Sequence, residues 1–224
     1  MDEALKQDVT ASCEAREGFY RFLASLFLYE PTDEQIQTMA QTPLPADAEG
    51  EIGRGYGLIN EYLRHRDLGT RQEIAVDYAR TFLGAGHYET ITAPPYESVF
   101  TSEDHLLMQD ARDGALAYYR AENLDLPADN TTPEDHVGFE LQFMATMIER
   151  MAAAADAGDD ARVRELVERQ RGFFTEHLAN WLTMFARAID ANCKTDFYHG
   201  VACLTRGLVA EERATVDELE ELTR

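Results

Sequence analysis

Apolar side chains recur at helical spacing along most of the chain. The clearest stretch places apolar residues at the spacing of one helix face: Phe19, Phe22, Leu23, Leu26 and Phe27. This pattern predicts a helix over residues 10–29, which Pro31 would end. No stretch shows the alternation of apolar and polar residues that marks a half-buried strand. The sequence therefore predicts an all-α protein.

Prolines, glycines and helix-capping patterns divide the rest of the chain into further helices. We expect helices over 32–41, 47–65, 70–83, 102–122, 133–157, 160–171, 173–192 and 195–212, and a short one from 215. Capping boxes, in which a Thr hydroxyl bonds the third N–H of the helix, are expected at Thr70, Thr132 and Thr215. The longest irregular segment in the middle of the chain would run from 85 to 101. The fold class is an irregular helical bundle of about ten helices.

The net charge of the chain disfavours some classes of function. The 224-residue chain has a formal net charge of −22, which disfavours nucleic-acid binding because contacts with phosphates require Lys and Arg. Only two lysines occur, Lys6 and Lys194. So many carboxylates with so few lysines suit a halophilic, high-salt cytoplasm; the alternative is that the acidic surface steers a cationic peptide inward. No run of about 18 apolar residues occurs, so no membrane insertion is expected.

The cysteines and the N-terminus indicate a cytoplasmic location. Cys13, Cys193 and Cys203 are odd in number and form no Cys-x-x-Cys pair, so neither a disulfide framework nor a zinc site is expected. Free thiols fit a reducing compartment. The first four residues are acidic rather than basic and precede no apolar segment of the secretory type.

The first notable motif is the proline–aromatic segment Ala93-Pro94-Pro95-Tyr96-Glu97-Ser98-Val99-Phe100. One interpretation is a rigid connector whose Tyr96 and Phe100 fill the core. The other is a preorganised loop at the edge of a peptide groove, in which Tyr96 offers an aromatic face and Glu97 a carboxylate. The pattern alone leaves both interpretations open.

The second motif covers residues 132–140. A capping box with acidic residues in the first helical turn explains Glu134 and Asp135 without any function. His136 needs another explanation, because it shares a helix face with Glu140 and then with apolar residues. A polar cluster at the head of an apolar face suits a ligand with a charged end and an apolar tail. A purely structural histidine at a helix start is the alternative.

A third motif combines an aromatic stripe with methionines. Four large apolar residues recur at helical spacing: Phe174, Leu178, Trp181 and Phe185. Such a stripe is typical of a protein core. Flexible methionine side chains would make the same surface adaptable to different peptides: Met144, Met147, Met151 and Met184. Core packing and a peptide groove are therefore both open.

The sequence contains no motif for catalysis or for a cofactor. It has no phosphate-binding glycine loop, and no histidine shows the Glu-x-x-His spacing of a di-iron site. His136 with Glu140 is one candidate pair of metal ligands, but a catalytic metal usually has three protein ligands. We therefore expect no enzyme activity, no cofactor and no metal site. A metal- or nucleotide-dependent enzyme is the alternative.

Taken together, the motifs resemble those of the TorD- and DmsD-type maturation chaperones, which guard twin-arginine signal peptides of molybdenum enzymes. Residues 93–104 look like the family's Ala-Pro-Pro-Tyr-Glu-Ser-Val-Tyr signature. Residues 133–140 look like its second signature, an acidic-proline run that ends in Asp-His. Residues 77–83, 174–185 and 196–198 are similar to other helices of the family.

The resemblance implies two helical subdomains, 1–128 and 129–224, joined by a hinge at the second motif. It also implies a chaperone whose partners are the signal peptide and the apo-form of a molybdopterin oxidoreductase. Such a chaperone delays export and assists cofactor insertion and folding. By position, Asp135 and His136 would bind the leader peptide, and Tyr96 and Glu97 would lie nearby.

The chemistry of a twin-arginine leader agrees with this assignment. Guanidinium groups pair best with carboxylates, so Asp135, Glu97 and Glu140 are candidate acceptors. The apolar run of the leader would lie in a groove with these candidate walls: Phe143, Met144, Met147, Trp181 and Phe185. The alternative is a maturation chaperone for a non-exported reductase subunit, which would bind a different segment. The sequence leaves monomer and homodimer, and the identity of the client enzyme, open.

Overall fold

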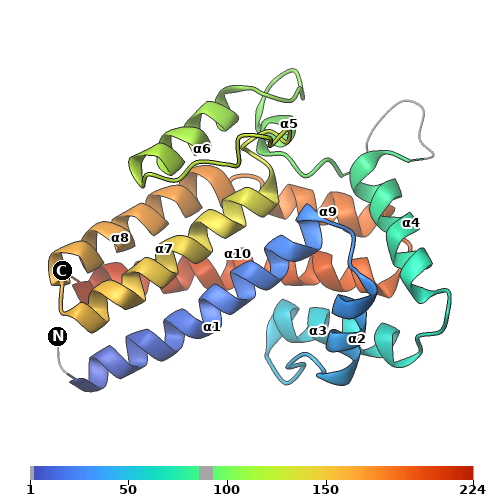
Figure 1. The fold of residues 1–224 in the computed structure, drawn as a ribbon, viewed down its shortest axis with the longest axis horizontal. Helices are drawn as coiled ribbons and strands as arrows, with labels where there is room; N and C mark the ends of the chain where they lie inside the picture. The colour runs from blue at the N-terminus through green and yellow to red at the C-terminus, as the bar shows by residue number, and fades with distance from the viewer. Residues whose placement is uncertain (1–2, 86–92, 224) are drawn as a thin grey trace. The chain divides into compact units, whose positions relative to one another are not determined.

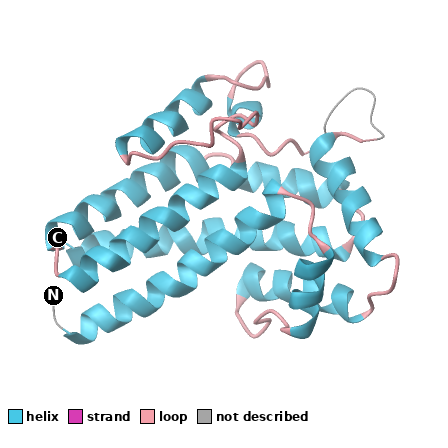
Figure 2. Cartoon of the chain, viewed as in Figure 1, coloured by secondary structure: helices cyan, strands magenta, loops and turns pink. Residues whose placement is uncertain are grey.

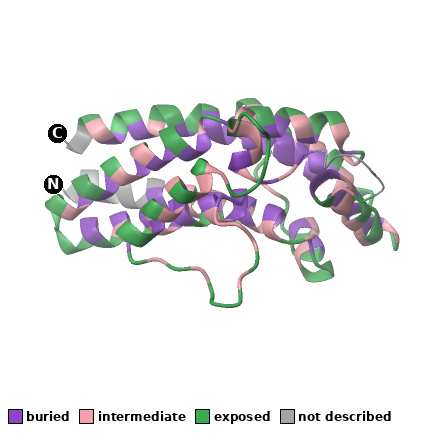
Figure 3. Ribbon diagram, turned by 90° about the horizontal axis from the view of Figure 1, so that it is seen from above, coloured by how far each residue is buried: buried purple, intermediate pink, exposed green. Residues whose placement is uncertain are grey.

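The computed structural model describes residues 3–85 and 93–223, with the side chains of 13–85 and 93–221. These residues form ten α-helices and one π-helical turn: α1 (Glu3–Leu28), α2 (Asp33–Gln41), α3 (Gly50–Arg64), α4 (Thr70–Leu83), α5 (Glu97–Thr101), α6 (Asp110–Ala121), α7 (Val137–Ala157), α8 (Asp160–Phe173), η1 (Phe174–Leu178), α9 (Leu182–Asn192) and α10 (Asp196–Thr223). No strand occurs in the described parts of the chain, and the all-α prediction is confirmed (Figures 1 and 2). Buried residues recur along one side of the helices, as amphipathic patterns require (Figure 3).

The chain forms two compact units, and each is built from segments that are distant in sequence. The first unit comprises Met1–Ala24, Tyr96–Asn180 and Glu211–Arg224; the second comprises Ser25–Pro95 and Trp181–Ala210. The boundaries fall inside α1 and α10, so each of these long helices contributes to both units. This division differs from the contiguous subdomains expected from the sequence, 1–128 and 129–224, because both ends of the chain join the first unit.

Helices α7 and α8 form the centre of the first unit. Gly158 ends α7 in the left-handed region, with a φ of 71°, as is common after a helix C-terminus. The Asp159 side chain then caps α8 by accepting a hydrogen bond from the Arg162 N–H. Aromatic rings fill the space between the two helices, where the centroids of Phe143 and Phe173 stand 4.4 Å apart.

Aromatic packing and one close helix approach stabilise the second unit. The ring of Phe82 stands 5.7 Å from that of Phe27 and 5.4 Å from that of Tyr198. Helices α3 and α10 meet at Gly55 and Gly200. A Cβ atom added to Gly55 would stand 2.7 Å from the Gly200 carbonyl oxygen, so the approach requires glycine.

The start of α6 and the loop before it differ from the expectation. Residues 86–92 of the expected irregular segment lie outside the described residues, and the end of that segment forms the short helix α5. Helix α6 begins at Asp110 rather than at 102. The preceding residues cannot be helical because His105 and Met108 have positive φ angles of 53° and 60°.

The capping boxes expected at Thr70 and Thr215 do not form, and one unexpected box does. Thr70 lies within the first turn of α4, whose N-cap residue makes no side-chain hydrogen bond. Thr215 lies inside α10, where its hydroxyl donates to the Glu211 carbonyl oxygen, so the two helices expected after 195 are one. The box that does form joins Thr32 and Gln35 at the start of α2.

The helix expected over 173–192 is interrupted. Helix α8 ends at Phe173, the π-helical turn η1 follows, and α9 begins only at Leu182. A π-helical turn inserts an extra residue per turn and redirects the side chains that follow it. His177 lies on this turn, and its position matters for the site described next.

Candidate functional site

The two motifs expected to bind a peptide meet in the first unit. An isolated β-bridge pairs Tyr96 with His136, and the Glu97 N–H donates to the Asp135 carbonyl oxygen at 3.0 Å. The rings of Tyr96 and His136 stand edge to face, with centroids 5.1 Å apart. Two segments that are distant in sequence therefore form one local structure.

Asp135 fastens the second motif to the first. Its Oδ2 atom accepts a 2.9 Å hydrogen bond from the Ser98 N–H, in the first turn of α5, and the residue is fully buried. Burial, together with the nearby Asp135 charge, raises the pKa of the Tyr96 hydroxyl. The capping box expected between Thr132 and Asp135 is wrong, because the Asp135 carboxylate bonds α5 instead of α7.

His136, rather than Thr132, is the N-cap of α7. Its Nδ1 atom accepts a 3.0 Å hydrogen bond from the Gly138 N–H. A ring nitrogen that accepts carries no proton, so the geometry assigns the proton of the neutral ring to Nε2. Burial lowers the pKa of His136 from 6.5 to about 4. The ring is therefore neutral at pH 7.

Glu97 faces the interior, where its carboxylate contacts two residues that the sequence analysis did not identify. Its Oε2 atom stands 2.7 Å from Nδ1 of His177, and its Oε1 atom accepts a 2.7 Å hydrogen bond from Nδ2 of Asn180. Only 2% of Glu97 is exposed. In the sequence, only the three-residue spacing of His177 and Asn180, which puts both on one helix face, could have indicated that they bind the same side chain.

Glu140 lies close to this group. Glu97, Glu140 and His177 are all buried, and each offers a donor atom within 4.8 Å of the others. Carboxylate and imidazole groups are ligands of several divalent metals. This donor set differs from the pair of His136 with Glu140 considered in the sequence. His177 also packs tightly on α6, because a Cβ atom added to Gly114 would stand 2.7 Å from its ring.

All five expected groove walls are core residues: Phe143, Met144, Met147, Trp181 and Phe185. Phe143, Met147 and Trp181 are 3%, 0% and 0% exposed. Trp181 belongs to the second unit, where its ring stands 5.2 Å from that of Phe185. The core interpretation of the aromatic stripe is confirmed, whereas a role of these residues in peptide binding stays a prediction.

A largely apolar pocket opens on the first unit beside α7. Its lining comes from α6, from the loop after α6 and from α7: Tyr119, Leu124, Asp125, Leu126, Phe139, Gln142, Phe143 and Thr146. Asp125 is exposed at the pocket. Leu124 and Leu126 were missed in the sequence, because they stand in a loop rich in Asp, Asn and Pro. Phe143 therefore lines this pocket although only 3% of it is exposed.

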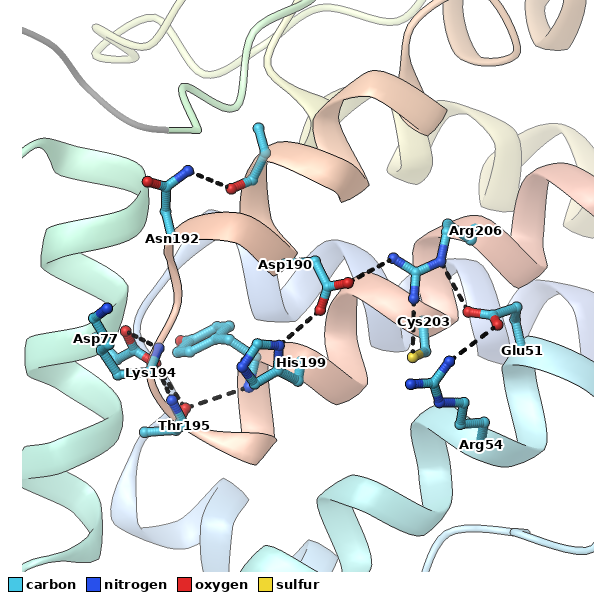
Figure 4. Close-up of polar contacts among 12 residues, drawn as sticks. Glu51, Arg54, Asp77, Asp190, Asn192, Lys194, Thr195, His199, Cys203 and Arg206 are labelled. Atoms are coloured by element: carbon cyan, nitrogen blue, oxygen red, sulfur yellow. Dashed lines mark hydrogen bonds and ion pairs between the residues drawn. The ribbon is translucent and has the colours of Figure 1, made fainter.

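Asp77 has a comparable joining role in the second unit. Its carboxylate accepts hydrogen bonds of 2.9 and 2.8 Å from the N–H groups of Lys194 and Thr195 (Figure 4). The Thr195 hydroxyl donates a further bond of 2.7 Å. These donors lie directly before α10, so Asp77 on α4 stabilises the start of that helix from another element.

Comparison with known proteins shows where the chain belongs. A family model described as the nitrate reductase delta subunit matches residues 46–187, which include both motifs. The chain belongs to the nitrate reductase delta subunit family. Within the described residues of this family member, no helix has the length and apolar character needed to cross a membrane.

Relatives of this family member carry the name of a chaperone. The chaperone protein TorD of Psychrobacter sp. (strain PRwf-1) is 28% identical over 223 residues, which cover 96% of this chain and 97% of the relative. The protein of the same name from Aliivibrio salmonicida (strain LFI1238) is 25% identical over 210 residues, covering 87% and 91%. These matches confirm the predicted resemblance to TorD-type chaperones, which are not enzymes.

A solved structure supports the fold. A crystal structure of an Archaeoglobus fulgidus protein, assigned as a redox enzyme maturation protein, aligns with a TM-score of 0.50 and 18% identity. The alignment covers 88% of this chain and 93% of the other. The helical architecture is therefore shared along nearly the whole length of both chains.

Proposed function

We propose that this TorD-type chaperone binds the twin-arginine signal peptide of a molybdopterin oxidoreductase in the cytoplasm. Binding would delay export of the apo-form and assist cofactor insertion and folding. The observation that carries the proposal is the joining of the two motifs, through the Tyr96–His136 bridge and the Ser98–Asp135 hydrogen bond. The segments that resemble the signatures of leader-binding chaperones thus form one structure rather than two separate sites.

The chemistry of a leader peptide fits the surface of the first unit. A leader of this class carries two guanidinium groups and an apolar run. The pocket lined by Phe139 and Phe143 suits an apolar side chain, and the exposed carboxylate of Asp125 suits a guanidinium group. The net charge of −22 attracts a cationic peptide at low salt.

The predicted site residues would divide into two roles. Tyr96 is half-buried, and Phe143 lines the pocket, so these two would contact the peptide. Five residues of the first unit are buried and would shape the surface from behind: Glu97, Asp135, His136, Glu140 and Met147. Trp181 is buried in the second unit, and its predicted role in leader binding stays a prediction. Direct contact between Asp135 and a guanidinium group would require the two motifs to separate.

Titration of a fluorescent leader peptide against the wild type and Asp135→Asn tests the proposal. The substitution keeps the size of the side chain and one acceptor but removes the charge. We expect the wild type to bind an Arg-Arg leader more tightly than its Lys-Lys form, and Asp135→Asn to bind it several-fold more weakly. Asp129→Asn, in an exposed loop of the same unit, is the matched control and should bind like the wild type. Equal affinity for both peptides would overturn the twin-arginine assignment.

A second candidate function follows from the description of the family. That description names a subunit of a reductase, which favours a client segment other than a twin-arginine leader. A chaperone for a non-exported reductase subunit would bind that subunit with an affinity that ignores Arg→Lys changes in its terminal segment. The Lys-Lys peptide above therefore separates the two candidates.

A further inference from the structure

Three consecutive apolar side chains are exposed to solvent in the loop that connects α5 and α6; Figure 1 shows the course of this loop. Leu106, Leu107 and Met108 are 57%, 44% and 60% exposed. Single exposed apolar residues are ordinary on protein surfaces, but a contiguous apolar patch marks an interaction site. We refer to residues 105–109 as the Leu-Leu-Met loop.

The Leu-Leu-Met loop has a defined conformation. His105 and Met108 adopt left-handed backbone angles, with φ of 53° and 60°, which cost energy for residues other than glycine. His105 Nδ1 donates to the Val99 carbonyl oxygen at 2.8 Å, and Gln109 Nε2 donates to the Leu107 carbonyl oxygen at 2.8 Å. Strained backbone held by surrounding contacts is characteristic of functional sites.

Ser98 connects this loop to the second motif. The Ser98 hydroxyl oxygen accepts a 3.1 Å hydrogen bond from the Gln109 N–H, at the end of the loop. The Ser98 N–H donates to Oδ2 of Asp135, and both Ser98 and Asp135 are fully buried. Asp135 is therefore linked to the loop through Ser98 alone. In this way a buried residue of the second motif helps to fix the conformation of an exposed loop.

Carboxylates flank the apolar side chains. Glu103 and Asp104 precede the loop, Asp110 and Asp113 follow it, and all four are exposed. The nearest following cation, Arg112, is bonded to Glu134 and paired with Asp113. An apolar centre with an acidic rim is complementary to a segment that is itself apolar and bears positive charges.

We propose that the Leu-Leu-Met loop is a docking surface for the apolar, arginine-bearing segment of the client signal peptide, an inference that rests on the function proposed above. The apolar run of the peptide would cover Leu106, Leu107 and Met108, and its guanidinium groups would pair with the flanking carboxylates. A second copy of this chain is a poor occupant, because it would bring the same acidic rim and a further net charge of −22.

The test compares two triple variants of the full-length protein. One replaces the loop side chains: Leu106→Gln, Leu107→Gln and Met108→Gln. The matched control replaces three exposed apolar residues of the second unit: Leu68→Gln, Val76→Gln and Leu83→Gln, which are 106%, 52% and 61% exposed. Each protein is titrated with an Arg-Arg leader peptide of a molybdopterin oxidoreductase from the same organism, and circular dichroism checks the fold.

We expect the loop variant to raise the Kd at least about tenfold and the control variant to leave it within about twofold, since three desolvated apolar side chains contribute well over 1.4 kcal/mol. If the wild type and the loop variant bind the leader equally, the docking surface is wrong while the proposed function stands. If the wild type binds no leader, the proposed function fails and this inference fails with it. Sedimentation velocity provides a further readout: dimers of the wild type that the loop variant lacks would assign the surface to a second copy and overturn the proposal.

Ser98→Ala distinguishes the effect of the loop conformation from that of the apolar side chains. This substitution keeps all three apolar side chains but removes the acceptor for the Gln109 N–H. We expect faster hydrogen exchange at residues 105–109 and a leader Kd raised several-fold. Faster exchange with an unchanged Kd would show that the conformation of the loop is irrelevant to binding and would contradict the role given to Ser98.

Discussion

Two buried carboxylates in this protein bond backbone N–H groups of other elements. Asp135 bonds the first turn of α5, and Asp77 bonds the residues before α10. A buried carboxylate is costly unless it is hydrogen-bonded, so each joins two segments that must stay together. The sequence marked Asp135 as notable through its motif, but its partner became visible only in the structure. Nothing in the local sequence around Asp77 indicates that it bonds Thr195.

Replacing Asp77 tests this role. We expect Asp77→Ala to lower the free energy of unfolding by about 1–3 kcal/mol, because two N–H groups and one hydroxyl lose a buried acceptor. Urea denaturation followed by circular dichroism provides the measurement. Glu61→Ala, which removes only exposed contacts with Arg64 and His65, should cost less than about 1 kcal/mol. Equal costs would contradict the assignment.

His136 makes stability depend on pH. Its folded pKa of about 4 lies below the ordinary 6.5, so between these values the unfolded chain binds a proton that the folded chain does not. Stability is therefore complete above pH 6.5 and falls as the pH drops towards 4, by up to about 3 kcal/mol. His136→Asn, which retains a capping side chain, should flatten this part of the profile.

Unfolding free energies of the wild type and His136→Asn, measured from pH 4.5 to 7.5, test this pH dependence. His65→Asn, at an exposed histidine outside the two motifs, is the control variant. A His136→Asn protein with the same slope as the wild type would show that this ring does not titrate as its burial requires.

The sequence predicted which helices form more accurately than it predicted the residues at which they begin and end. Apolar spacing identified α1 because that helix buries one face along the chain, and prolines, glycines and capping patterns indicated α3 and α4. The starts of α6 and α7 were misplaced because they depend on tertiary contacts, including the bond from Gln109 to Ser98. The π-helical turn that places His177 beside Glu97 also has no local signature. The motifs were therefore visible in the sequence, but their shared geometry was not.

Alanine substitutions at two glycines test where the helices end. Gly158 has a φ of 71° and no atom within 4 Å of an added Cβ, whereas Gly57 lies inside α3 with equally open space and no positive φ. We expect Gly158→Ala to destabilise the protein by about 1 kcal/mol through backbone strain. Gly57→Ala should stabilise it by about 0.5–1 kcal/mol through helix propensity. Thermal melts of both variants provide the comparison, and shifts of the same sign would contradict the assignment of the α7 C-terminus.

For the whole molecule, the net charge of −22 is the dominant electrostatic feature. Like charges repel in the folded state, and this repulsion weakens as the Debye length falls from about 10 Å at 0.1 M salt to about 3 Å at 1 M. A cationic leader would lose long-range attraction over the same range, while contacts in a desolvated pocket would be less affected. Salt should therefore stabilise the protein and slow leader association more than it speeds dissociation.

Melting temperatures in KCl test the charge argument. We expect the melting temperature at pH 7.5 to rise between 0.1 and 1 M KCl. The rise should shrink near pH 4.5, the isoelectric point of the sequence, where the net charge vanishes. A melting temperature that falls with salt at pH 7.5 would show that self-repulsion does not limit stability.

We propose that the joined motifs of the first unit build the surface that binds the leader. Hydrogen–deuterium exchange with and without a saturating Arg-Arg leader peptide tests it most directly. We predict slower exchange in residues 96–109 and 124–146, with no change in 33–83 of the second unit. Protection confined to the second unit, or no protection anywhere while the peptide is bound, would contradict the claim.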